Sequence, residues 1–399
     1  MIYSDFQGIK LSLLGFGTMR LPLLPGGGDG DIDEAQVQAM TDYAMEHGVN
    51  YFDTAYPYHA SRSELVIGRA LARYPRESYY LADKFPGHQI SETYDPEAVF
   101  EDQLRKCGVE YFDFYLLHNV NEGSIATYMD PRWGIVDYFR EQRRLGRIRH
   151  LGFSCHAAVK GIEQFLDYCG EDMEFCQIQL NYLDWTLQDA RGKYELLTER
   201  GIPVWVMEPL RGGKLARLAP EAEERLRAAR PDENTPAWAF RFLQGLPNVK
   251  VVLSGMSSPE QMADNVRIFS ERRPLSESEQ ELLLDVAEGL KNSVPCTACR
   301  YCCEGCPMQL DIPNLLAEYN ELRVGRSVNI NMRIEALSPD KRPDACIGCG
   351  QCARVCPQGI DVPGALSDFA GMLAAAPSWA EISRKRAEEA EAAKTTPDR

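Results

Sequence analysis

The sequence has little positive charge for its length. Its 399 residues include 43 Lys and Arg against 59 Asp and Glu, which gives a formal net charge of −16 and a pI near 5.0. A protein that binds nucleic acid needs a basic surface to displace the counterions of the phosphates, so this composition argues against that class. An acidic surface stays compatible with a basic protein partner.

Signals for export and for membrane insertion are also lacking. No uncharged apolar stretch reaches the roughly 18 residues that a spanning helix needs. The first residues, MIYSDFQGIKLSLLGFG, contain no basic region followed by a long apolar run, as a secretory signal would. We therefore expect no membrane span and a cytoplasmic location.

The 13 cysteines are not distributed as in a disulfide scaffold, which would be short and have cysteines throughout. Most of them lie in two runs that both read C-x2-C-x2-C-x3-C-P, the spacing that surrounds [4Fe-4S] clusters in bacterial-type ferredoxins. The runs consist of Cys296, Cys299, Cys302 and Cys306, and of Cys346, Cys349, Cys352 and Cys356. This pattern predicts thiolate ligands, a reducing compartment and the ability to handle single electrons.

The ligand sets follow from a property of two-cluster ferredoxins, in which the fourth cysteine of a run generally binds the other cluster. One cluster is then expected on Cys296, Cys299, Cys302 and Cys356, and the second on Cys346, Cys349, Cys352 and Cys306. Cys303 is left over, as an alternative ligand or as a bystander. Zinc is the competing interpretation, but the third cysteine and the C-P ending are not typical of zinc ribbons.

The first 290 residues show a different pattern, in which short apolar runs alternate with amphipathic helical stretches. The strand candidates are Leu11–Gly15, Tyr51–Asp53, Tyr79–Lys84, Phe112–Leu117, His150–Phe153, Phe175–Leu180, Val204–Met207 and Val251–Leu253. Eight such units in this length predict an α/β fold of the (β/α)8 TIM-barrel type. A doubly wound open sheet is the runner-up, but the turn after the first run, Gly15 to Arg20, lacks the third glycine of the dinucleotide fingerprint.

Three regions are therefore expected along the chain. Residues 1–290 form the barrel, and residues 291–372 form a smaller, mostly α-helical domain with two [4Fe-4S] clusters. Residues 373–399 form a charged tail that is a frayed helix or disordered. Helical patterns between the two cysteine runs are typical of the α-helical ferredoxin type, and oxygen-sensitive clusters imply an anaerobic or low-oxygen setting.

Four ionisable residues lie where a barrel carries its chemistry, at the carboxyl ends of strands. They are Asp53, Tyr58, Lys84 and His118. An alkoxide formed by hydride addition to a carbonyl needs a proton, and a tyrosine with a pKa of about 10 is a poor donor near neutral pH. We expect the Lys84 ammonium to lower the pKa of Tyr58, Asp53 to hold Lys84, and His118 to orient the substrate oxygen.

The sequence around these residues matches a known pattern in several segments. These are GFGTMRLP (15–22), NYFDTAYPYHASRSELVIGRAL (50–71), LADKFP (81–86), DFYLLHNV (113–120), LGFSCH (151–156), QLNYLD (179–184), MEPLRGGKL (207–215) and SGMSSPEQMADN (254–265). Over about residues 8–290 the chain resembles the aldo-keto reductases. The resemblance implies a NAD(P)H-dependent oxidoreductase for small carbonyl or alcohol substrates, with Tyr58 as the general acid.

The same resemblance implies a set of cofactor contacts. Ser154, Gln179 and Asn181 correspond to the residues that hold the nicotinamide amide, and the loops after the seventh and eighth strands are where barrels commonly bind phosphate. The full set is Gly17, Thr18, Met19, Ser154, Gln179, Asn181, Glu208, Pro209, Leu210, Gly212, Ser254, Gly255, Met256, Ser257, Gln261 and Asn265. Many family members carry a Lys and an Arg for a 2′-phosphate where this chain has Gly255 and Gln261, which makes NAD, or even FMN, plausible instead of NADP.

Three functions are compatible with these features. The first is a nicotinamide-dependent carbonyl reductase whose clusters serve electron transfer or redox sensing. The second is a ferredoxin-linked reductase, with a flavin converter, in which an electron-transfer partner and the clusters supply the barrel site. The third is a non-catalytic redox sensor or electron carrier. The intact set of four residues favours the first.

Overall fold

The computed structural model describes residues 1–87, 95–291, 294, 296, 298, 300–325, 327–356, 358–385 and 388. Two compact units divide the chain, Met1–Leu283 and Leu284–Glu388. The domain limits expected from the sequence, at residues 290 and 372, stay a prediction.

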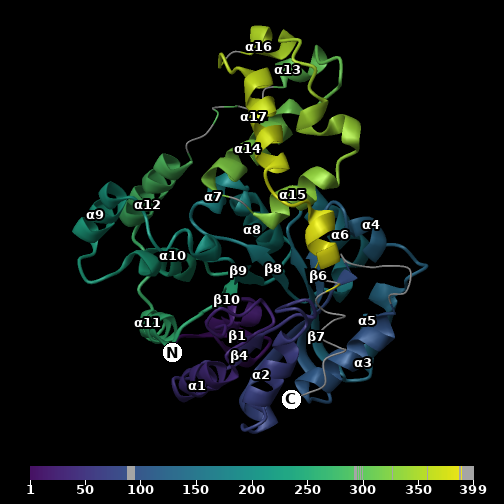
Figure 1. The fold of residues 1–399 in the computed structure, drawn as a ribbon. Helices are drawn as coiled ribbons and strands as arrows, with labels where there is room; N and C mark the ends of the chain where they lie inside the picture. Colours follow the sequence, from purple (N-terminus) through teal and green to yellow (C-terminus); the bar gives the residue numbers. More distant parts are fainter. Residues whose placement is uncertain are drawn as a thin grey trace. The chain divides into compact units, whose positions relative to one another are not determined.

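The first unit is built around a closed barrel of eight parallel strands in the order β10-β3-β4-β5-β6-β7-β8-β9 (Figure 1). The strands are β3 (Leu14–Gly17), β4 (Tyr51–Asp53), β5 (Tyr80–Phe85), β6 (Phe112–Val120), β7 (Ile148–Cys155), β8 (Cys176–Gln179), β9 (Val204–Met207) and β10 (Val249–Ser254). Nearly every strand residue is buried, because helices cover the outside and side chains fill the inside. The predicted (β/α)8 fold is confirmed, and the open sheet is excluded.

Helices follow the strands around the barrel. They are α1 (Glu34–Glu46), α2 (Ser63–Leu71), α3 (Pro96–Cys107), α4 (Ile125–Tyr128), α5 (Ile135–Arg144), α6 (Val159–Cys169), α7 (Asp184–Leu187), α8 (Ala190–Glu199), α9 (Pro220–Ala229), α10 (Thr235–Gln244), α11 (Pro259–Ile268) and α12 (Glu277–Leu290). Local chemistry sets several starts: Asp33 caps α1 by accepting from Gln36 N, and Asp95 caps α3, which has proline in its first turn.

One strand prediction was wrong at the N-terminus. The apolar run Leu11–Gly15 is split between β2 (Ile9–Ser12), which pairs with β1 (Tyr3–Phe6) as an antiparallel hairpin, and the barrel strand β3. Phe6 of the hairpin packs within 5.7 Å of Phe114 and 5.1 Å of Trp205, ring centroid to ring centroid. The hairpin therefore covers the amino end of the barrel, and its apolar residues cannot be told from a barrel strand by pattern alone.

The second unit is helical, with no strand among its described residues. Its helices are α13 (Tyr301–Glu304), α14 (Ile312–Val324), α15 (Val328–Glu335), α16 (Gln351–Val355) and α17 (Val362–Ala374). Leu316, Tyr319, Leu366 and Phe369 are part of its core, where α14 packs on α17. The unit is an internal repeat: Asp311 caps α14 and Asp361 caps α17, each after a cysteine run.

The predicted charged tail begins inside α17, and hydrogen bonds to α15 hold its first residues in place. Residues 379–385 are helical, and Trp379 N donates to Glu335 Oε1 at 2.5 Å, while Asn331 Nδ2 donates to Pro377 O at 2.9 Å. The end of the tail, 389–399, lies outside the described residues. Among the residues that the structure describes, no helix is long and apolar enough to cross a membrane.

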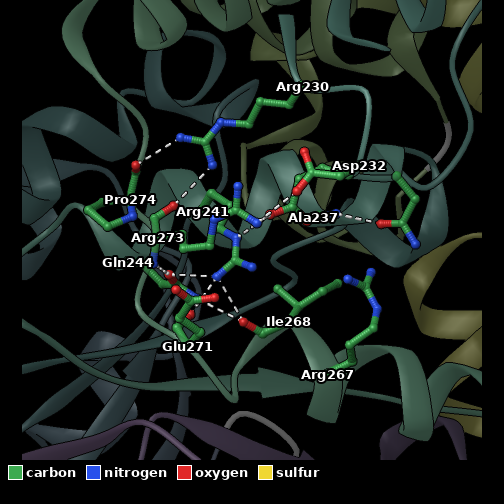
Figure 2. A network of polar contacts seen from close by, with 12 residues as sticks. Arg230, Asp232, Ala237, Arg241, Gln244, Arg267, Ile268, Glu271, Arg273 and Pro274 are labelled. Atoms are coloured by element: carbon green, nitrogen blue, oxygen red, sulfur yellow. Dashed lines mark hydrogen bonds and ion pairs between the residues drawn. The ribbon is translucent and has the colours of Figure 1, made fainter.

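A buried arginine holds the last helices of the barrel together (Figure 2). Arg241 on α10 is 2% exposed, and its Nε donates to Glu233 Oε1 at 3.0 Å. Its Nη1 donates to the carbonyl oxygens of Ile268 and Glu271 at 2.8 and 2.6 Å, at the end of α11. One guanidinium thus satisfies the last carbonyl of α11, which has no intrahelical partner, and a carbonyl of the segment that follows the helix.

This arrangement predicts that Arg241→Met destabilises the fold by about 3 kcal/mol, because the buried Glu233 carboxylate loses its closer cation and keeps only Arg273, whose Nη1 lies 3.4 Å from Oε1. The effect is measured by unfolding the protein with denaturant and following its tryptophan fluorescence. The double variant Arg241→Met, Glu233→Met is expected to recover much of the loss, since no charge is then buried alone. A single variant as stable as the wild type would contradict the role of Arg241.

Candidate active site and cluster sites

The four predicted catalytic residues lie together at the carboxyl end of the barrel. Lys84 Nζ donates to Asp53 Oδ1 at 2.5 Å and to Thr54 O at 2.6 Å. The same nitrogen lies 5.0 Å from the centroid of the Tyr58 ring. The Tyr58 and His118 rings meet edge to face, with centroids 5.8 Å apart. Strands β4, β5 and β6 supply Asp53, Lys84 and His118, and Tyr58 lies in the loop after β4.

Burial dominates the electrostatics of this group. Asp53 is 3% exposed and Lys84 fully buried. Burial raises the pKa of the Asp53 carboxyl above its ordinary value although Lys84 opposes the shift. Burial lowers the pKa of Lys84, but the charges of Asp53 and Tyr58 outweigh this and leave the pKa of the ammonium raised. Lys84 is therefore a cation at neutral pH.

The expectation for Tyr58 needs a correction. Lys84 does lower the pKa of Tyr58, as the sequence predicted, but desolvation by burial is the larger cause and leaves that pKa above its ordinary value. The phenol therefore carries its proton at neutral pH. Such a group can donate a proton to a developing alkoxide, and the cation next to it stabilises the phenolate that results.

A second group of buried charges lies behind Lys84, and the sequence reasoning missed it. Glu64 on α2 and Asp83 on β5 are both fully buried. Lys106 Nζ on α3 lies 2.8 Å from Glu64 Oε2 and 4.0 Å from the centroid of the Tyr56 ring. Burial raises the pKa of Asp83 far above its ordinary value, and the Glu64 charge adds to the rise. These residues can be recognised as buried charges only from their positions on α2 and β5 in the folded structure.

Several predicted cofactor residues surround the rim next to the four catalytic residues. Ser154 Oγ on β7 accepts from Asn119 N at 2.8 Å. The side-chain amides of Gln179, at the end of β8, and of Asn181, just after it, both donate to Asp184 Oδ2, at 2.8 and 2.6 Å. A carboxylate only accepts hydrogen bonds, so the oxygen of Gln179 must face away from Asp184.

This orientation leaves an acceptor for a ligand. Gln179 is 5% exposed, and its Oε1 has no hydrogen-bond partner among the described residues. A buried unsatisfied acceptor is costly, and a ligand that offers an N–H group, such as a carboxamide, would satisfy it. The fully buried Asp184, held by Arg211 Nε at 3.0 Å, was not identified from the sequence, although it lies in one of the matching segments.

The loops after β9 and β10 come close to the segment after β3. An added Cβ on Gly212 would lie 2.9 Å from Arg20 Nη2, and one on Gly255 would lie 3.1 Å from Arg20 Cβ. The exposed Arg20 side chain therefore crosses both glycines, between the two predicted phosphate loops. Ser257 Oγ donates to Arg20 O at 2.8 Å and fixes this contact. The sequence reasoning did not identify Arg20.

Other predicted cofactor residues form hydrogen bonds within and next to these loops. Asn265 Nδ2 donates to Ser254 Oγ at 2.9 Å, and Gln261 Oε1 accepts from Ser257 N at 2.8 Å. Thr18 Oγ1 donates to Asp53 O at 2.9 Å, so its side chain is used within the fold. Among the remaining members of the set, Gly17, Pro209 and Met256 are buried, Glu208 and Leu210 are half-buried, and Met19 is exposed.

The cysteines surround two cavities in the second unit. Cys296, Cys302 and Cys356 line one of them. Cys306, Cys346, Cys349 and Cys352 line the other. Each cavity thus combines the first cysteines of one run with the last cysteine of the other. Cys299 lies outside the described residues, and Cys303 lines neither cavity.

The donor set fits an iron–sulfur cluster better than a single ion. The sulfurs of a tetrahedral zinc site, each about 2.3 Å from the ion, would lie close together. Among the described residues no three His, Cys, Asp or Glu side chains converge in this way. The thiols instead surround apolar cavities with Leu316, Ile360 and Val362 around one and Leu310 and Leu366 around the other.

Fold and site define the class of this protein: a (β/α)8 barrel with a group of ionisable residues at the carboxyl ends of its strands. The family can then be stated. The sequence model described as "Aldo/keto reductase family" matches residues 13–287, and the "4Fe-4S dicluster domain" matches residues 295–360. The chain belongs to the aldo/keto reductase family and is an oxidoreductase with a 4Fe-4S dicluster domain.

Individual relatives agree with this assignment. The chain is 26% identical to an NADH-specific methylglyoxal reductase of Escherichia coli K12, over 71% of this chain and 97% of the relative. It is 24% identical to an L-galactose dehydrogenase of Arabidopsis thaliana, over 70% and 90%. Among solved structures, the holo form of a Bacillus halodurans aldo-keto reductase is similar with a TM-score of 0.57 and 27% identity, covering 72% of this chain and 96% of that one.

The buried acidic pair next to Lys84 predicts a pH dependence of stability. Because the pKa of Asp83 is raised in the folded state, folding favours its protonated form, and stability falls as pH rises from the unfolded pKa of about 4 toward the folded one. Asp83→Asn removes this ionisation while keeping an acceptor for Lys84 N, which lies 2.8 Å from Asp83 Oδ1. We expect the variant to gain melting temperature over the wild type from pH 5 to pH 8. An equal difference at both pH values would contradict it.

Proposed function

We propose that this protein reduces a small carbonyl compound with a nicotinamide cofactor, and that Tyr58 is the proton donor. The single observation that carries the proposal is the group at the barrel rim, in which a buried Lys84–Asp53 ion pair lies against Tyr58 and His118. The reverse reaction, oxidation of an alcohol, uses the same residues. Bound nicotinamide supplies or accepts the hydride.

The residues at the rim would divide the remaining work. His118 orients the substrate oxygen by a hydrogen bond, and Tyr58 Oη gives its proton to that oxygen as negative charge develops on it. The Lys84 ammonium stabilises the resulting phenolate, and Asp53 holds Lys84 in place. Solvent returns the proton to Tyr58 after release of the alcohol.

The cofactor would be held by the side chains on the adjacent rim. Gln179 Oε1 is the buried acceptor for a carboxamide N–H, with Asn181 and Ser154 next to it. Arg20 brings a positive charge to the two loops proposed to bind the phosphates. Because Gly255 and Gln261 stand where a 2′-phosphate would need charge, we propose NADH as the preferred donor; the E. coli relative is NADH-specific.

The second unit would hold two [4Fe-4S] clusters in a reducing, cytoplasmic and low-oxygen setting. We assign Cys296, Cys299, Cys302 and Cys356 to one cluster and Cys346, Cys349, Cys352 and Cys306 to the other. The lining of the two cavities supports this exchange of the fourth cysteine. Each cluster passes one electron, so an electron-transfer partner protein is part of the proposal.

A second candidate function follows from the clusters themselves. Hydride transfer needs no one-electron carrier, so two cluster sites favour a ferredoxin-linked reductase in which a flavin converts between single electrons and hydride. Anaerobic purification with iron, sulfide and flavin quantitation separates the two candidates. Bound flavin, together with clusters that are oxidised on addition of a carbonyl substrate, would favour the second.

The proposed role of Tyr58 predicts that removal of its hydroxyl group has a large effect on kcat. Tyr58→Phe is expected to lower kcat for NADH-dependent reduction of methylglyoxal, or of the best carbonyl compound in a panel, by about 100-fold or more, with little change in NADH affinity. Tyr56→Phe, in the same loop, is the matched control. Equal rates for wild type and Tyr58→Phe would rule out the proposed chemistry.

The cluster assignment predicts which cysteines act together. Cys356→Ser and Cys296→Ser are expected to alter the same signal in the electron paramagnetic resonance spectrum of the reduced protein, while Cys306→Ser and Cys346→Ser alter the other. Cys303→Ser is the control and should leave both signals. If Cys356→Ser affects the same signal as Cys346→Ser, each run binds its own cluster and the assignment is wrong.

A further inference from the structure

The turn that follows Tyr58 has an unusual backbone. His59, Ala60 and Ser61 have φ values of 51°, 52° and 66°, and none of them is glycine. An L-residue held in this left-handed region is strained, and such a conformation persists only where its surroundings enforce it. The turn closes directly on the proton donor, because Ser63 N donates to Tyr58 O at 3.3 Å.

One end of the turn is held by the His59 side chain. His59 is 5% exposed, and both of its ring nitrogens have partners. Leu21 N donates to Nε2 at 3.0 Å, and Nδ1 lies 2.8 Å from Asp29 O. Because a backbone N–H only donates, Nε2 is the acceptor and the neutral ring carries its proton on Nδ1. The ring therefore ties the turn to the segment that follows β3.

The other end of the turn is held by hydroxyl groups. Ser63 Oγ donates to Thr18 Oγ1 at 2.7 Å and lies 2.9 Å from Thr54 Oγ1. Thr18 in turn donates to the backbone of Asp53. These bonds fix Ser63 at the start of α2 but do not reach the side of the turn that carries Tyr58. The ring of His59, directly after Tyr58 in the chain, holds that side of the turn.

We propose that His59 is a positioning residue: it enforces the left-handed turn and thereby places Tyr58 against Lys84 and His118. This inference rests on the proposed function of Tyr58. The His59 ring bonds to Leu21 N and lies against Asp29, and neither residue belongs to the group of four, so His59 acts through Tyr58 and not on the reacting atoms. Strain in the turn makes the position of Tyr58 depend on these two hydrogen bonds.

The test uses the full chain with its clusters, assayed with NADH and methylglyoxal or the best carbonyl compound of the panel. His59→Leu keeps a buried side chain without ring nitrogens and is expected to lower kcat by about 10- to 100-fold, since a misplaced catalytic group costs this much. His59→Gln, whose amide can accept from Leu21 N, should restore part of the rate. His47→Leu, at an exposed histidine after α1, is the matched control.

The decisive comparison is made in the Tyr58→Phe background. If His59 acts through Tyr58, then His59→Leu changes kcat by less than about twofold in that background, and KM for NADH is unchanged in both. A merely structural role would lower the rate by the same factor with or without the Tyr58 hydroxyl, and this result would overturn the proposal. So would a wild-type rate in His59→Leu.

A measurement that needs no turnover tests the positioning role of His59 separately from the proposed chemistry of Tyr58. Amide hydrogen exchange in a peptide spanning residues 54–64 should become faster in His59→Leu, with no change in peptides elsewhere in the barrel. Unchanged exchange there overturns the proposal for His59, whatever the activity. Faster exchange together with equal rates for wild type and Tyr58→Phe would uphold the positioning of Tyr58 and reject the proposed chemistry instead.

Discussion

Closing eight parallel strands into a barrel forces every strand to end at the same rim, and the candidate site depends on this constraint. Residues far apart in the chain meet there only because their strands point the same way. The β1–β2 hairpin covers the opposite end with Phe6, which packs among the side chains that fill the barrel. The helices on the outside hold the strands in register, and Arg241 secures the last of them (Figure 2).

Within that rim, burial controls the chemistry. Lys84 is removed from water and stays charged because Asp53 compensates it. The same burial keeps Tyr58 protonated, so in the proposed reaction the phenol would donate the proton and the lysine would stabilise the phenolate that results. The price of this arrangement is local strain, with a left-handed turn next to Tyr58 and two further buried carboxyls behind Lys84. Such strain and buried charge are typical of functional sites.

The second unit is built from two copies of one sequence pattern. Two cysteine runs, each followed by an aspartate-capped helix, pack α14 against α17 so that the end of each run reaches the start of the other. Neither cavity is complete without both runs. In the proposed function the clusters would handle one electron at a time and the barrel two, so the clusters would connect the protein to redox partners that hydride transfer alone does not serve.

Much of this could be predicted from the sequence. The periodicity of apolar residues determined the barrel, the cysteine spacing determined the two cluster runs, and strand-end positions indicated Asp53, Lys84 and His118. Pattern alone could not separate β2 from β3, because both are short apolar runs. It also missed Asp184, Arg20 and the pair of Glu64 and Asp83, since a charged residue in a sequence is usually a surface residue. Only the tertiary structure decided which charges are buried, that burial outweighs Lys84 in the pKa of Tyr58, and that His59 is tied to Leu21, because desolvation and long-range contacts exist only once the chain has folded.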